Sequence, residues 1–102
     1  MVTFRERLYF GETIKKKHRK AIYNIRHEKL APGVYVIAFA SNEQNLFDII
    51  PANELLFPFY KKKEIYILGM ANGLSEAKIV VKDMVAEVYH KTGGFNVREY
   101  FS

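Results

Sequence analysis

Two runs of unbroken apolar residues constrain the fold more than any other feature of this chain. VYVIAFASN at 34–42 and IYILGMANG at 65–73 are near repeats, which share a tyrosine in second place and an alanine in seventh. A short run that is apolar at every position is typical of a strand buried on both faces of a sheet. We therefore expect residues 34–40 and 65–70 to form two central, neighbouring strands.

The segment between these runs indicates how the two strands are connected. Residues 41–63 are long enough for the crossover that a parallel pair needs. Leu46, Phe47, Ile49 and Ile50 predict a short helix there, and Ser41 and Gln44 have the spacing of a capping box. The pattern favours a parallel pair, and an α+β domain with an antiparallel pair is the alternative.

The rest of the chain predicts two longer helices and two weaker strands. Thr13 is a candidate N-cap for an amphipathic helix over 13–28, in which apolar residues recur at helical spacing. Ser75 is a candidate cap for a second helix that Gly93 ends in a left-handed conformation. Residues 3–10 and 95–99 alternate as strands would. The predicted order is (β)αβαβα(β), a single 1–102 domain of α/β or α+β class folded as a two- or three-layer sandwich.

The basic charge of the chain is concentrated in one segment. The net charge is +5, and residues 15–20 hold five of the 16 basic residues and no acid, which leaves 11 basic against 11 acidic residues elsewhere. Such a segment on a helix favours binding to an anionic macromolecule, with nucleic acid the first candidate and an acidic protein the second. A solvated helix face would explain the same pattern. The candidate residues are Lys15, Lys16, Lys17, Arg19, Lys20, Tyr23 and Arg26.

A second hypothesis places a small-ligand or anion site at the ends of the two repeats. If the repeats are parallel strands that lead into helices, their carboxyl ends meet at one edge, where open α/β sheets bind ligands. No glycine-rich phosphate motif supports such a site, and helix capping alone would select the same residue types. The candidate residues are Ser41, Asn42, Asn72, Gly73 and Ser75.

A third hypothesis is an oligomerising structural protein. Its candidate contacts are the aromatic side chains Phe57, Phe59, Tyr60 and Phe101. Exposed aromatic clusters favour association, whereas aromatic residues packed over a small core would have no such role.

The residues carry no signature of an enzyme or a metal site. The chain has no cysteine, and its three histidines, His18, His27 and His90, lack metal-binding spacing. No sequence motif supplies a general base that could activate a serine as a nucleophile. We expect no cofactor, no metal and no catalytic residue. The apolar runs are too short to span a membrane and the first residues lack a leader pattern, so a cytoplasmic protein without a membrane partner is expected.

Three stretches resemble a family of small uncharacterised bacterial proteins. They are LYFGETIKKKHRKAIYNI, SNEQNLFDIIPANELL and HKTGGFNVREYF. The resemblance would cover nearly the whole chain. It implies a stand-alone cytoplasmic protein and provides no catalytic residues.

Overall fold

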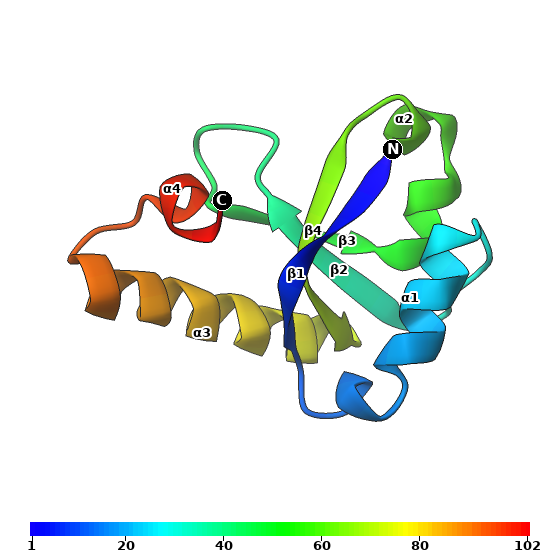
Figure 1. Ribbon diagram of the computed structural model, residues 1–102, viewed down its shortest axis with the longest axis horizontal. Coiled ribbons are helices and arrows are strands. Elements are labelled where there is room, and N and C mark those ends of the chain that lie inside the picture. The colour runs from blue at the N-terminus through cyan, green and yellow to red at the C-terminus, as the bar shows by residue number, and fades with distance from the viewer.

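The computed structural model describes all 102 residues as a four-stranded sheet with helices on both faces (Figure 1). The strands are β1 (Val2–Phe10), β2 (Val34–Phe39), β3 (Phe47–Pro51) and β4 (Ile65–Asn72). The helices are η1 (Ile14–Lys16), α1 (His18–Arg26), η2 (Ala52–Leu56), α2 (Pro58–Lys61), α3 (Leu74–Thr92) and α4 (Val97–Phe101). The sheet order is β1-β4-β2-β3, so the two apolar repeats, β2 and β4, are the central neighbours that the sequence predicts.

The direction predicted for these two strands is wrong. β2 and β4 are antiparallel, with Val34 opposite Asn72, and only β1 and β4 form a parallel pair. The chain reverses after β2 because residues 47–51 form strand β3, which returns antiparallel along β2. The predicted helix start is instead a turn, in which the Asn42 side chain accepts hydrogen bonds from the backbone N–H groups of Gln44 and Asn45.

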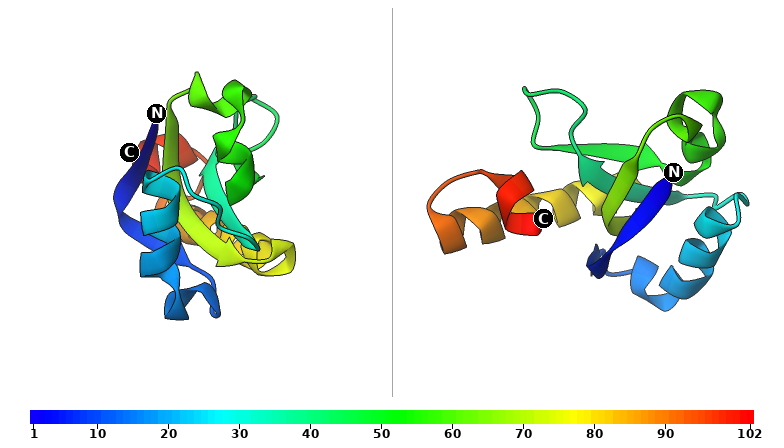
Figure 2. Two further views of the ribbon diagram at one scale, coloured as in Figure 1. Left: turned by 90° about the vertical axis from the view of Figure 1, so that its right-hand side faces the viewer. Right: turned by 45° about the horizontal axis from the view of Figure 1, so that its top comes forward.

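The core lies on both faces of the sheet, so the fold is a three-layer α+β sandwich. Val36 and Ile67 face α1 and η2, whereas Ile37 and Leu68 face α3 and α4. Two views show α3 running out beyond the sheet, where α4 packs near its far end (Figure 2). The predicted layers are confirmed.

The predicted helix over 13–28 is shorter and interrupted. A 3₁₀ turn, η1, is separated from α1 by Lys17, whose φ of −134° is not helical, and Thr13 makes no capping bond within its own helix. The predicted apolar stripe is confirmed, because Ile14, Ala21 and Ile25 are buried. Helix α1 ends where the Lys29 N–H donates to the Asn24 carbonyl at 2.7 Å.

The other elements agree with the sequence in part. The strand at the N-terminus is confirmed as β1, at an edge of the sheet, although residues 5–8 bulge opposite Leu68. Helix α3 ends as predicted, at Gly93 with φ of 77°. The predicted strand over 95–99 is wrong, because α4 begins there, capped by the Asn96 side chain, which accepts from the Glu99 N–H.

Candidate functional site

Four basic side chains form an unpaired cationic surface at the start of α1. Lys16, Lys17, Arg19 and Lys20 are all exposed, and none forms an ion pair. Lys15 differs, because its ammonium lies 3.5 Å from the Glu12 carboxylate. We call Lys16, Lys17, Arg19 and Lys20 the basic surface. The structure therefore brings most of the predicted basic candidates together.

The other two basic-helix candidates lie further along α1. Tyr23 is 51% exposed, and its ring lies 4.1 Å from that of His27, with the Lys29 ammonium 5.2 Å from the ring centre. The Arg26 guanidinium is engaged differently, 4.9 Å over the Phe4 ring. Tyr23 therefore continues the accessible surface, whereas Arg26 packs against β1.

The histidine within the basic segment has a structural role. The His18 ring lies 4.6 Å from the Phe10 ring, and its Nδ1 atom is 2.9 Å from the Lys15 carbonyl. These contacts fix the junction between η1 and α1. His18 therefore packs against β1 next to the basic surface.

Another run of three lysines, at 61–63, reaches the far end of α1. The Lys61 ammonium lies 3.1 Å from the Glu28 carboxylate, just beyond that helix. The Lys63 ammonium instead lies 4.0 Å over the Phe59 ring. Only part of this run therefore adjoins α1.

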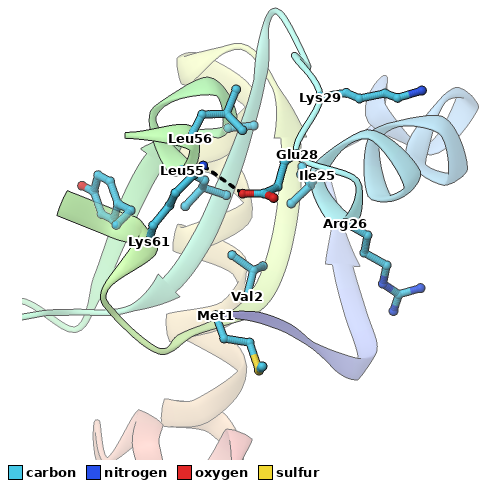
Figure 3. A pocket seen from close by; sticks show the side chains of 11 residues that line it. Met1, Val2, Ile25, Arg26, Glu28, Lys29, Leu55, Leu56 and Lys61 are labelled. Carbon is cyan, nitrogen blue, oxygen red and sulfur yellow. Dashed lines mark ion pairs between the residues drawn. The ribbon is translucent and has the colours of Figure 1, made fainter. Parts of the chain in front are cut away.

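A cavity of about 420 Å³ opens beneath the Glu28–Lys61 ion pair (Figure 3). It lies between the end of α1, the start of β1 and the η2–α2 segment. Figure 3 shows Glu28 and Lys61 pointing toward one another across the cavity, whereas Arg26 and Lys29 point away. The apolar side chains that line it are Met1, Val2, Ile25, Ala52, Leu55, Leu56 and Tyr60.

The small-ligand site predicted at the ends of the repeats is not formed. Because β2 and β4 are antiparallel, Ser41 and Asn42 lie at one end of the sheet and Asn72 and Gly73 at the other. The Gly73 N–H is also used within the fold, since it donates to the Gly33 carbonyl at 2.8 Å. This hypothesis is therefore wrong.

Ser75, the fifth residue of that site, lies in the first turn of α3, whose start has no side-chain cap, and the neighbouring Glu76 carboxylate binds groups outside that helix. It accepts from the Asn72 N–H at 2.7 Å, the Thr13 hydroxyl at 2.6 Å, and the Thr13 and Ile14 N–H groups. Burial raises the pKa of Glu76, but these hydrogen bonds outweigh it and hold the pKa below its usual value. Glu76 thus joins the start of α3 to η1.

A second carboxylate that the sequence did not reveal holds two tyrosines. Glu87 accepts from the Tyr9 hydroxyl at 2.6 Å and from the Tyr100 hydroxyl at 2.8 Å. Burial, then the hydrogen bond to Glu87, raises the pKa of Tyr9 to about 12. The hydrogen bond that Tyr100 itself donates to Glu87 raises the pKa of Tyr100. The cluster ties β1 and α4 to α3.

The proposed oligomer contacts do not form one exposed cluster. Phe57 and Phe59 are 57% and 62% exposed, and Tyr60 is half-buried. Phe101 is fully buried, with its ring 5.5 Å from that of Tyr9 and 5.9 Å from that of Phe47. The assignment of Phe101 to a contact surface is therefore wrong.

Two kinds of feature are absent from the structure. No three histidine, aspartate or glutamate side chains gather closely enough to share a metal ion. None of the helices has both the length and the apolar character needed to cross a bilayer.

Comparison with family models, curated proteins and solved structures finds no match to this chain. The resemblance to small bacterial proteins therefore stays a prediction.

Proposed function

We propose that this chain is a non-enzymatic binding module that engages an anionic macromolecule, with nucleic acid the first candidate, through the basic surface. The observation that carries the proposal is the set of four exposed cations without an ionic partner at the start of α1. Phosphates of a nucleic acid would supply that partner.

These cations are placed where they oppose folding. The first turn of α1 holds Arg19 and Lys20 and no acid, although the N-terminal end of a helix carries partial positive charge. Lys16 and Lys17 lie just before this helix end and add further positive charge beside it. A solvated surface gains nothing from this arrangement, whereas a bound polyanion would offset the unfavourable charge at the helix end.

The basic surface would hold phosphates without reading sequence. Lysine and arginine contacts to phosphate provide affinity and position but no base discrimination. Tyr23 extends the surface with an exposed ring on which an unpaired base can stack. The module should therefore bind with little sequence preference and strong salt dependence.

A salt titration of binding tests the proposal. Fluorescence anisotropy with labelled single-stranded and duplex oligonucleotides should give a slope of log affinity against log salt of about −3 to −4 if all four cations meet phosphates. The Lys16→Gln/Lys20→Gln variant should reduce the magnitude of that slope by about two.

Two results would overturn the proposal for nucleic acid. One is the lack of detectable binding at low salt, and the other is an unchanged slope in the double variant. Binding to an acidic polypeptide without binding to either oligonucleotide would identify an acidic protein as the partner class.

A further inference from the structure

Glu28 occupies a backbone conformation that favours glycine. It follows the last turn of α1 with φ of 54°, and it is the only non-glycine residue of the chain with a positive φ. The Glu28 N–H donates to the Ile25 carbonyl and the Lys29 N–H to the Asn24 carbonyl, which is the Schellman arrangement at a helix end. Glycine lacks a Cβ atom and adopts this conformation without a steric clash, so the helix end gains nothing from a glutamate.

The side chain of Glu28 also contributes little to the fold. Its ion pair with Lys61 is largely exposed, because 65% of the glutamate side chain and 51% of the lysine side chain are accessible. Exposed pairs of this kind stabilise proteins weakly. A strained residue that the fold does not require is a reason to look for a binding role.

The cavity beneath the pair combines an apolar interior with two opposite charges. Its volume of about 420 Å³ is in the range of small-ligand pockets. Ile25, Leu55 and Val2 provide apolar walls. Because Arg26 and Lys29 point away, the charged side chains directed at the cavity are those of Glu28 and Lys61 (Figure 3). Met1 also lines the cavity, and its α-ammonium donates to the Lys63 carbonyl.

We propose that this cavity binds a free α-amino acid with a large apolar side chain. Its ammonium would pair with Glu28, its carboxylate would pair with Lys61, and its side chain would enter among the apolar residues. The 3.1 Å pair need not open, because the four charges then alternate in sign around a ring. An amphipathic anion would instead meet the Glu28 carboxylate, and an amphipathic amine would meet the Lys61 ammonium.

This site is separate from the basic surface and does not depend on the function proposed for it. Titration of the full chain with L-leucine and L-phenylalanine, followed by ligand-observed NMR, should show saturable binding. Three analogues serve as probes: 4-methylpentanoate lacks the ammonium, 3-methylbutylamine lacks the carboxylate, and glycine lacks the side chain. Each should bind at least about tenfold more weakly than leucine, because each lacks one of the three contacts.

Variants separate the site from the fold. Glu28→Gln and Lys61→Gln should each weaken leucine binding by about tenfold, whereas Lys62→Gln, an exposed neighbour outside the cavity, should not change it. Glu28→Gly should lose binding while the melting temperature stays the same or rises by a few degrees. Failure of both amino acids to bind, equal binding of 4-methylpentanoate, or full binding by Glu28→Gln would overturn the proposal.

Discussion

Helices α1 and α3 cover opposite faces of the same sheet, yet they use charge in opposite ways. Helix α3 has 19 residues, an acid in its first turn at Glu76, and two basic residues in its last, His90 and Lys91. Those are the positions that the helix dipole favours. Helix α1 has nine residues, no acid in its first turn and only two buried side chains, Ala21 and Ile25.

Helix α3 stabilises the fold, whereas the start of α1 presents charge to solvent. Four side chains of α3 are buried in the core, and the Glu87 cluster ties it to both ends of the chain. The four cations of the basic surface form no ion pair within the protein. We infer that the requirements of folding account for the buried and charged residues of α3. They do not account for the unpaired cations at the start of α1.

Truncation of core side chains should show the largest difference in stability between the two helices. Met84→Ala in α3 should lower the free energy of unfolding by about 2–5 kcal/mol, because the side chain is fully buried and leaves a cavity. Ile25→Ala in α1 should fall at the lower end of that range, because Ile25 is 8% exposed near the helix end. Urea denaturation measures both. A larger loss for Ile25→Ala would show that α1 carries more of the fold than we infer.

Glu76 joins the two regions, so its replacement should have the next largest effect. Glu76→Gln should lower the free energy of unfolding by about 1–3 kcal/mol, since the backbone N–H groups of Thr13, Ile14 and Asn72 lose a charged acceptor. Gly11→Ala should act in the same direction, because the added Cβ atom would overlap the Glu76 carboxylate. Urea denaturation at neutral pH measures both losses.

The same carboxylate predicts a loss of stability in acid. The pKa of Glu76 is lower in the folded protein than its ordinary value of 4.5, so its contribution is present above that pH and is lost as the pH falls through the folded-state pKa. Denaturation across this range should show the loss in the wild type and not in Glu76→Gln. Equal acid sensitivity of the two proteins would contradict the role of Glu76.

The tyrosine cluster should give a smaller effect at high pH. The pKa of Tyr9 is raised from 10.0 to about 12, so its neutral phenol contributes stability below pH 10 that is lost as the pH rises through about 12. Tyr100→Phe should cost about 1 kcal/mol at neutral pH, the usual contribution of one hydrogen bond. Tyrosinate absorbance during a pH titration should show late-titrating tyrosines, one of which Tyr9→Phe removes. The absence of late-titrating tyrosines in the wild type would argue against the cluster.

Replacing the basic surface should have the smallest effect on stability. Lys16→Gln/Lys20→Gln should change the free energy of unfolding by no more than about 0.5 kcal/mol, and toward greater stability, because positive charge is removed from the N-terminal end of α1. Thermal denaturation at low salt measures the change. A loss above about 1 kcal/mol would show that these lysines have a structural role and would remove the contrast between the two helices.

Local patterns predicted the elements better than their pairing. The unbroken apolar runs identified β2 and β4, and helical spacing identified the buried side of α1. The sequence did not reveal that residues 47–51 form a strand, because Phe47, Ile49 and Ile50 fit the period of a short helix as well as that of a strand. Because residues 47–51 were predicted as a helix, β2 and β4 were predicted to be parallel instead of antiparallel. The predicted ligand site depended on that parallel pair and is therefore not formed.

The carboxylate contacts depended on the fold itself. Glu76 meets residues more than 60 positions away, and Tyr9 lies 78 positions from Glu87. No spacing rule joins such pairs. The basic surface was predictable because its residues are adjacent in the sequence, although the kink at Lys17 was not.

The most direct test of our account compares a lysine pair of the basic surface with a lysine pair on α3 at equal net charge. Nucleic-acid affinity at low salt would be measured for the wild type, Lys16→Gln/Lys20→Gln and Lys78→Gln/Lys82→Gln, the last pair being exposed on α3. We predict a loss of about tenfold or more for the α1 variant and a much smaller loss for the α3 variant. Equal losses would show that net charge alone drives binding, and would contradict the assignment of binding to α1.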